Sequence, residues 1–439
     1  MVKSGLKRIC GSAVALSILC GVVLSGCSNS TAGSTSGASS SGKLSGTISV
    51  AGWNDAADAL SAEAKAFMAE NPGTTVNVQK VDGNYTKLYT ELAAGSGVPD
   101  VVQMQNRDVQ SFVNKYPDAW ADVSDMMKSE ESNFDSYVLN LTKIKGKYYA
   151  VPWDLGPCAL YYRKDIFQQA GVDPSSIKTY DDYIAAGKKI VQATDGKTKL
   201  LGFDYSGSTS NDMLLLLLNQ LGGQFYDSKG KVKLDSDEMV KAMNLCKQFI
   251  SEGVSINLSN EWNDRITATE NNQIATIPYA VWYAGTLESS NSDQSGKWGI
   301  IPLPAFTAGG NTQANEGGSA LAISSKTSNA ALAKAFVKFS LMSSEGNKIN
   351  LDAGKLFTSY KKSYSDPEYK EVDSYFGVSV GATFAGLSDK IPSVTYGPYF
   401  TDVNNALKTA VGSILLKSGD VSKTLSDATA SAQKAVDNE

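Results

Sequence analysis

The sequence predicts an α/β fold with two lobes, between which the chain crosses more than once. Strand-like and helix-like segments alternate over residues 47–104 and again over residues 159–278. This alternation predicts sheets covered by helices. Residues 146–165 resemble a strand interrupted at Pro152 and Pro157, and such a strand cannot lie within one sheet because each proline removes a ladder donor. A crossing between two sheets would explain the interruption, and an ordinary loop is the alternative.

The first 26 residues have the composition of a targeting segment. Lys3, Lys7 and Arg8 give a basic start, and the uncharged residues 9–24 are too short to span a bilayer comfortably. Leu24-Ser-Gly-Cys27 resembles a bacterial lipobox, which implies cleavage before Cys27 and a lipid on its thiol. A plain secretory peptide or a short membrane anchor is the alternative.

Residues 27–45 are nearly all Ser, Thr, Gly, Ala and Asn, so we expect a flexible tether. The residues that remain after the tether exceed one ordinary hydrophobic core, which favours two domains.

Residues 47–104 predict the first unit as β-α-β-α-β. Asp55 is a suitable N-cap, apolar residues follow it at helical spacing, and Asn71-Pro-Gly ends that helix. Strands are expected at residues 47–51, 75–81 and 99–104, with a second helix at residues 85–94. This order predicts a parallel sheet.

Ligands of parallel sheets bind beyond the carboxyl ends of the strands. Trp53 and Asn54 follow the first strand, and Asn106 and Asp108 follow the third. These four residues are therefore candidates for ligand binding. Trp53 has an alternative role as a core residue that covers a helix.

Residues 159–278 predict a second α/β unit. Strands are expected at residues 159–162 and 200–205 and within 271–278, and helices at residues 164–170, 180–194, 211–221 and 235–252. The apolar run 214–218 is a buried helical segment, far shorter than a membrane span.

The composition excludes several classes of function. The chain has no histidine, which removes Ser-His-Asp and Cys-His catalysis and His-ligated metals. A net charge of −5 disfavours nucleic acid as a partner. Cys10 and Cys20 belong to the targeting segment, and we expect Cys158 and Cys246 to pack as small apolar residues. We expect neither a metal nor another cofactor.

Four groups of motifs occur in order between residues 47 and 416. They are YAVPWDLGPCALYYRKDIF at 149–167 with AG at 170–171, YAVW at 279–282 with KWGIIPLP at 297–304, EGGSALAI at 316–323, and YFG at 375–377 with YGPY at 396–399. Together with the lipobox and the tether, they resemble the family 1 extracellular solute-binding proteins, which are sugar-binding lipoproteins of bacterial ABC importers. In one departure, many relatives carry a polar residue such as Gln shortly after Tyr-Phe-Gly, where this chain has Val378 and Ser379. That contact, and the sugar, therefore stay open.

The resemblance implies an α/β, two-lobe, periplasmic-binding-protein-like fold with a ligand cleft between lobes joined by crossing segments. The chain would cross near residues 152–159, 302–318 and 351–358. Prolines and glycines within residues 302–310 mark the second crossing independently. Lobe one would hold residues 46–154 and 311–350, and lobe two residues 155–310 and 351–439.

A pyranose has apolar C–H faces, which aromatic rings cover, and hydroxyls, which carboxylates and amides bind. Trp153 and Trp282 are favoured as stacking rings because the family stacks sugars at the matching motifs. On that basis Trp153→Ala should weaken sugar binding far more than it lowers stability. Trp262 has an alternative role as a surface anchor, and Trp120 and Trp298 are expected to be structural. The candidate ligand-binding residues are Trp53, Asn54, Asn106, Asp108, Trp153, Asp154, Trp262, Trp282, Gly317, Gly318, Ser319 and Tyr396, with Glu261 and Tyr399 as further candidates.

The expected function is a carbohydrate-binding lipoprotein that captures a mono- or oligosaccharide and delivers it to an ABC permease. We expect a monomer without enzymatic activity, anchored through the lipid on Cys27 at the extracytoplasmic face of a Gram-positive cell membrane. One alternative is a surface-anchored glycoside hydrolase that uses Asp154 and Glu261 as paired carboxylates. An adhesin is a further alternative, but it would not explain the prolines at the crossings.

Overall fold

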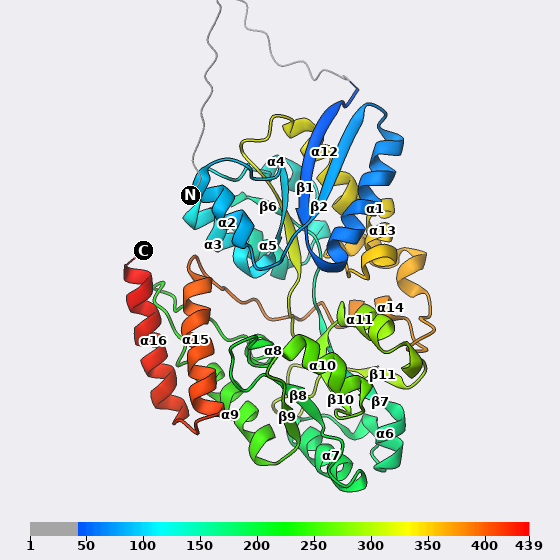
Figure 1. Cartoon of the computed structure of the whole chain (residues 1–439), viewed down its shortest axis with the longest axis vertical. Helices are drawn as coiled ribbons and strands as arrows, with labels where there is room; N and C mark the ends of the chain where they lie inside the picture. The colour runs from blue at the N-terminus through cyan, green and yellow to red at the C-terminus, as the bar shows by residue number, and fades with distance from the viewer. Residues whose placement is uncertain (1–42, 439) are drawn as a thin grey trace, which may run out of the picture. The chain divides into compact units, whose positions relative to one another are not determined.

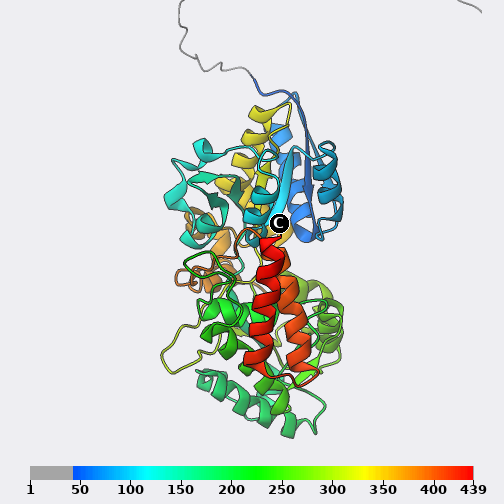
Figure 2. The same ribbon diagram turned by 90° about the vertical axis from the view of Figure 1, so that its left-hand side faces the viewer.

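Two β-sheets organise the computed structural model, which describes residues 43–438 (Figures 1 and 2). The predicted signal peptide, Cys27 and most of the predicted tether lie outside these residues. No helix among residues 43–438 is long and apolar enough to cross a membrane.

The first sheet has five strands in the order β2-β1-β3-β12-β6. Strands β1 (Gly46–Gly52), β2 (Thr74–Lys80) and β3 (Val101–Gln105) are parallel, as predicted. Strand β12 (Ser319–Ile323) runs antiparallel between β3 and β6 (Ala150–Pro152), so the sheet is mixed. The lobe around this sheet is called lobe one below.

Helices cover both faces of this first sheet (Figure 1). Helices α1 (Asn54–Glu70) and α12 (Ala330–Met342) pack in one core, with α13 (Ser344–Gly354) against both, and α2 (Thr86–Ala94) and α3 (Val109–Lys115) pack in the other. The prediction of Asp55 as the N-cap of the first helix is wrong. Trp53 holds that position, and its backbone N–H donates to the side chain of Gln103 over 2.9 Å.

The second sheet has the order β10-β7-β11, and both pairs of strands are antiparallel. Its strands are β7 (Cys158–Arg163), β10 (Thr276–Ala280) and β11 (Trp298–Ile301). A parallel pair, β8 (Leu201–Phe203) and β9 (Ser255–Asn257), adjoins it through a bridge between Lys199 and Ile274. The predicted strands and helices are present, but this sheet is not parallel. The lobe around it is called lobe two.

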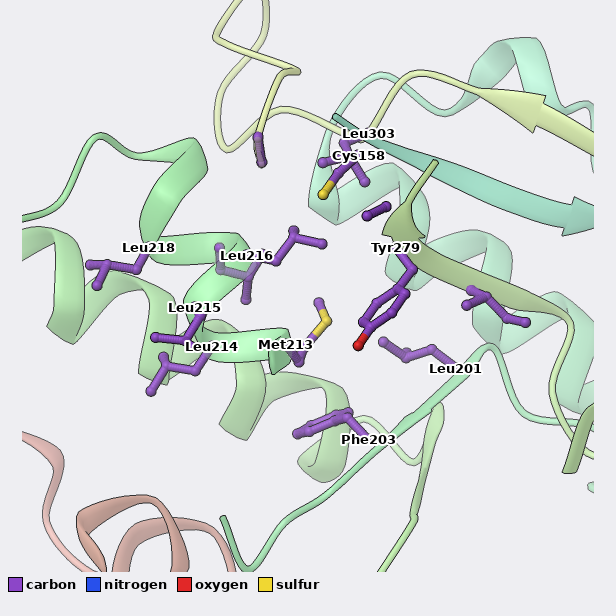
Figure 3. Packing of buried hydrophobic residues seen from close by; sticks show 14 of the residues in the cluster. Cys158, Leu201, Phe203, Met213, Leu214, Leu215, Leu216, Leu218, Tyr279 and Leu303 are labelled. Atoms are coloured by element: carbon purple, nitrogen blue, oxygen red, sulfur yellow. The ribbon is translucent and has the colours of Figure 1, made fainter. Parts of the chain in front are cut away.

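A leucine-rich helix forms the centre of lobe two. Helix α8 (Asp212–Gln220) shares a core with Leu201, Phe203 and Tyr279. Its Met213 side chain points toward the Tyr279 ring, whereas Leu214, Leu215 and Leu218 point to the opposite side (Figure 3). Cys158 packs in the same core, and both it and Cys246 are buried and free, as predicted. The other helices of this lobe are α6 (Lys164–Gln169), α7 (Tyr180–Ala193), α9 (Asp237–Ser251), α10 (Glu261–Glu270), α11 (Tyr283–Ser290), α14 (Val380–Ala385), α15 (Phe400–Leu415) and α16 (Val421–Asp437).

Three crossing segments connect the two sheets and bond to one another. The first runs from β6 to β7, the second from β11 to β12, and the third follows α13. The backbone N–H of Leu155 donates to the Phe357 carbonyl, and the N–H of Glu316 donates to the Gly156 carbonyl, both over 2.9 Å. Leu356 and Tyr360 pack in the core of lobe one, so the third crossing extends beyond residue 358.

Candidate functional site

Four aromatic side chains of lobe two pack together in a cluster that we call the aromatic shelf: the partly exposed Trp262 and Trp282 and the buried Tyr279 and Tyr283. Trp262 lies in the first turn of α10, and the other three lie between the end of β10 and the start of α11. The rings of Trp262 and Trp282 stack with centroids 6.0 Å apart, and the Tyr279 ring meets Trp282 edge-on at 5.0 Å. Trp262 is 41% exposed, which is unusual for so large an apolar ring.

Charged side chains surround the shelf and form a second group, the charge network: Arg107, Asp212, Glu261, Arg265 and Glu316. The Arg265 guanidinium lies 4.2 Å from the centre of the Tyr279 ring and is bonded to the buried carboxylate of Glu261. The Tyr279 hydroxyl donates to Asp212. A guanidinium over a ring face gains cation–π stabilisation, so Arg265 holds the shelf from below.

The charge network joins the two lobes. Arg107 lies in the short 3-10 turn Asn106–Asp108 of lobe one, and its Nη1 is 3.4 Å from Oε1 of Glu316 on the second crossing. Burial, and next the Asp212 carboxylate, raise the pKa of Glu316 to about 8, and Arg107 opposes that shift. Burial also raises the pKa of Glu261, against the neighbouring Arg265.

The second crossing touches the shelf directly. The Trp282 indole N–H donates to the Glu316 carbonyl over 3.1 Å. Gly317 follows with φ +75°, and a Cβ there would lie 3.2 Å from the indole nitrogen. The glycine therefore lets the backbone approach the ring as closely as it does. The shelf thus lies where a crossing segment passes between the lobes.

Asn106, Asp154, Gly318 and Ser319, all predicted ligand contacts, bond to one another where the first two crossings meet lobe one. The Asp154 carboxylate accepts the Ser319 backbone N–H over 2.6 Å, and the Asn106 amide donates to the Asp154 carbonyl over 3.1 Å. The Asn106 N–H donates to the Gly318 carbonyl. Burial raises the pKa of Asp154 to about 7. This arrangement holds the crossings together, and three of these side chains are buried within it.

Trp153, which was predicted to stack on the ligand, is buried in this structure. Its ring is 1% exposed in the core of lobe one, and its indole N–H donates to Oδ1 of Asn350 over 2.8 Å. Tyr396 is also buried, stacked on Phe225 at 5.4 Å. Neither ring has an open face in this structure, because core side chains cover both. Trp120 and Trp298 are buried, as the structural role predicted for them requires.

The remaining candidates of lobe one lie at the ends of strands, as expected from the sequence. Trp53 is buried against Tyr85, edge-on at 5.3 Å, which agrees with its alternative role as a core residue. Asn54 is exposed, with φ +50°. Asp108 is half-buried beside Arg107, and burial raises its pKa. Asn54 and Asp108 are therefore the groups of lobe one that remain free to meet a ligand.

Sequence reasoning missed most of the charge network. Glu261 and Arg265 are four residues apart on one helix, a spacing that predicts an ion pair and could have been recognised. Arg107 and Asp212 carry no comparable local signal. The proposed hydrolase pair gains no support, because the Asp154 carboxylate is bonded to backbone and the Glu261 carboxylate to Arg265.

Residues 53–348 match the model of a family described as bacterial extracellular solute-binding proteins. The chain is 29% identical over 375 residues to a lactose-binding protein of Rhizobium radiobacter, covering 82% of this chain and 86% of the relative. It is 26% identical over 355 residues to an arabinooligosaccharide-binding protein of Halalkalibacterium halodurans, covering 76% of each.

Solved structures show the same architecture. An ABC-transporter-associated binding protein from B. animalis subsp. lactis in complex with β-1,6-galactobiose has a TM-score of 0.73 at 24% identity, covering 90% of this chain and 97% of the other. The galacto-N-biose-/lacto-N-biose I-binding protein of Bifidobacterium longum has a TM-score of 0.75 at 19% identity, covering 90% and 98%. The predicted two-lobe, periplasmic-binding-protein-like fold is confirmed.

Proposed function

We propose, since this chain belongs to the bacterial extracellular solute-binding proteins, that it captures a carbohydrate outside the cell and delivers it to an ABC permease. The observation that carries the proposal is the stacked pair of Trp262 and Trp282. Its outer ring is exposed beside charged groups at the boundary of the lobes. An open indole face suits the C–H face of a sugar, and carboxylate and guanidinium groups suit its hydroxyls. The lactose- and arabinooligosaccharide-binding relatives support a carbohydrate as the ligand.

Transport would depend on closure of the lobes around the ligand. The aromatic shelf belongs to lobe two, while Arg107, Asn54 and Asp108 belong to lobe one. A ligand that touches both groups binds the closed arrangement more tightly than the open one, so it shifts the population toward closure. The permease would recognise that closed form. The protein is proposed to act as a monomer and without catalysis.

The lipobox supports attachment to the membrane. We propose that the Cys27 thiol carries the lipid and that residues 27–45 tether the folded part at the extracytoplasmic face of a Gram-positive cell membrane. Cys27→Ala should release the protein into the soluble fraction and abolish labelling by a fatty-acid probe. Unchanged labelling of the variant would contradict the assignment.

Calorimetric titration of the full chain, kept in mild detergent, tests the binding function. We expect heat from lactose or arabinooligosaccharides and none from amino acids or peptides. Trp282→Ala should weaken binding by at least thirtyfold, the loss typical of a central aromatic anchor. Leu416→Ala, at a side chain that is 51% exposed on lobe two, is the matched control and should bind as the native chain does.

Two results would contradict the proposal. One is binding of amino acids or peptides with no sugar bound. The other is native affinity in Trp282→Ala. Chromatography of the sugar after incubation separates binding from hydrolysis, because a binding protein returns its ligand intact.

A further inference from the structure

The charge network contains more acidic groups than basic ones. Asp212, Glu261 and Glu316 contribute three carboxyl groups, and Arg107 and Arg265 contribute two guanidinium groups. Arginine stays charged at any ordinary pH, so three ionised carboxylates would leave one negative charge without a cationic partner. The network is therefore balanced only when one of its carboxyl groups carries a proton.

Burial makes that unbalanced charge costly. Glu261 is 3% exposed, Glu316 is 5% exposed, and Arg265 is buried beside them. One carboxylate oxygen of Glu261, Oε2, has no hydrogen-bond partner among the described residues. A carboxyl group that is removed from water without full pairing takes up a proton instead of staying ionised. The network in this arrangement thus favours one bound proton.

Glu316 is the carboxyl group best placed to hold the proton. The Glu261 carboxylate is bonded to Arg265, and Asp212 accepts a tyrosine hydroxyl. Within the described structure, the ion pair of Glu316 is the 3.4 Å approach of Arg107 Nη1, which is longer than the distance of about 2.7–2.9 Å in strong charge-assisted bonds. The pKa of Glu316, which burial above all raises to about 8, agrees with this assignment.

The other titratable groups that face Glu316 leave the charge balance unchanged. Burial raises the pKa of each of them, so they keep their protons at neutral pH. They are Tyr137, Cys158, Tyr279 and Tyr396. Asp108 lies beside Arg107, and its ionisation would only add to the excess of acid.

The network spans the boundary between the lobes, so their separation would change its surroundings. Arg107 belongs to lobe one, and its guanidinium lies 5.8 Å from the centre of the Phe400 ring on α15 of lobe two. The Ser111 hydroxyl of α3 donates to the Gly397 carbonyl over 3.4 Å, so the two lobes touch on this side. Separation of the lobes would withdraw Arg107 and admit water to Glu316. A hydrated carboxyl group returns toward its usual pKa of 4.5 and releases its proton at neutral pH.

We propose that closure of the lobes around a sugar takes up one proton, which the Glu316 carboxyl group holds while the sugar is bound. The inference rests on the proposed function and adds its dependence on pH. The closed form keeps the proton up to about pH 8, whereas the open form loses it above about pH 4.5. The affinity for sugar is therefore full below about pH 4.5, falls as pH rises and levels off above about pH 8. Capture is strongest where the outside of the cell is acidic.

Calorimetry of the full chain in mild detergent measures the protons directly. Lactose and arabinotriose are titrated in pairs of buffers that differ in their enthalpy of ionisation, at about pH 6.5 and about pH 9.5. The difference between the two heats, divided by the difference between the buffer enthalpies, gives the protons taken up per sugar. We expect close to one at the lower pH and close to none at the higher. The affinity should be about tenfold weaker at pH 7 than at pH 6.

Two variants should move the proton uptake in opposite directions. Glu316→Gln should take up no proton, and its affinity should not follow pH, because the remaining two carboxylates balance the two guanidinium groups. Arg107 lowers the pKa of Glu316, so in Arg107→Gln the closed form should keep its proton to a higher pH than in the native chain. A variant that only disturbs packing would not produce this opposition. Glu270→Gln is the matched control with native uptake, because Glu270 is exposed at the far end of the helix that carries Glu261.

Sugar binding without proton uptake would overturn the inference, as would release of a proton on binding or unchanged uptake in Glu316→Gln. In each of these cases the proposed function would stand, because the sugar is bound. Absence of binding for both sugars at every pH would overturn the proposed function and the inference with it. If Glu316→Gln does not fold, Arg107→Gln decides, and an uptake profile that is not shifted in pH would overturn the inference.

Discussion

At the scale of single residues, we propose that Trp153 acts through packing. Its ring fills the core of lobe one, and its N–H is bonded to the buried Asn350. We therefore expect Trp153→Ala to lower the free energy of unfolding by about 3–5 kcal/mol, the usual cost of removing a buried aromatic side chain. The affinity of the folded variant for sugar should stay within about twofold of native. Urea denaturation and calorimetry measure the two quantities.

Trp153→Phe is the matched control. It keeps a ring in the core but removes the N–H donor and part of the ring volume, and the Asn350 carbonyl left short of a partner alone costs about 1–3 kcal/mol. A Trp153→Ala variant of native stability with weakened binding would reverse this interpretation and return the residue to the ligand site.

The buried carboxyl group of Glu63 should make the free energy of unfolding depend on pH. The side chain is fully buried in lobe one, beside Ser340 and Asn350, and burial raises its pKa well above the usual value of 4.5. The folded state therefore keeps the proton at pH values where the unfolded state has lost it. Stability from this group is complete below about pH 4.5 and falls as pH rises toward the folded-state pKa.

Glu63→Gln should remove that dependence, because an amide of similar shape carries no proton to lose. Between pH 5 and 9 the variant should lose less stability than the native chain, as measured by urea denaturation at each pH. Glu70→Gln is the control, since Glu70 is an exposed residue at the end of the same helix. Parallel pH profiles for native chain and Glu63→Gln would show that Glu63 ionises freely.

At the scale of elements, the crossing segments depend on close backbone packing. A Cβ at Gly156 would lie 1.9 Å from the Glu316 carbonyl oxygen, which belongs to the second crossing. Gly156→Ala should therefore push the first two crossings apart and destabilise the fold by more than about 2 kcal/mol, as overpacking does. Thermal unfolding measures the loss.

Gly386→Ala is the control for Gly156→Ala. Gly386 has φ −70°, and the nearest atom to an added Cβ would be 3.5 Å away, so alanine fits there without strain. Equal melting temperatures for the two variants would contradict this expectation, because they would mean that the first two crossings can move apart without loss of stability.

The sequence predicts local elements well because their signals are local. Asn71-Pro-Gly ends α1, and the chain turns from helix to strand there as expected. Which strands pair is harder to predict from the sequence. Strand β12 pairs with β3, and the bonded residues Gln103 and Ser319 are 216 residues apart. No local pattern specifies such a partner, so the antiparallel strands of both sheets were not foreseen.

The same reason limits prediction of the site. Trp282 and Trp262 could be nominated as aromatic residues near a conspicuous motif or loop, and the structure does stack them on each other. The motifs favour Trp153 equally, yet the core of lobe one covers its ring, and its N–H donates to Asn350, 197 residues away. Whether a tryptophan lies on a surface or in a core depends on which distant element covers it.

At the scale of the whole molecule, a ligand that binds only the folded state must stabilise it. Sugar at 100 times its dissociation constant should raise the free energy of unfolding by about 2.7 kcal/mol. The radius of gyration from small-angle scattering should fall at the same concentrations, because closure brings the lobes together. Trp282→Ala, with binding weakened thirtyfold, should gain only about 0.9 kcal/mol at that concentration, and its compaction should be smaller than that of the native chain. Stabilisation without compaction would mean that the lobes are already closed in the free protein.

The position of β12 also has a consequence for how the protein is made. This strand lies between β3 and β6, so the first sheet stays incomplete until the ribosome has synthesised residue 323. Pairings this distant in sequence form slowly. A chain proposed to leave the cytoplasm through a signal peptide benefits from that delay, because its amino-terminal lobe has no finished sheet during early synthesis. We therefore expect the interleaved topology to keep the nascent protein competent for the proposed export.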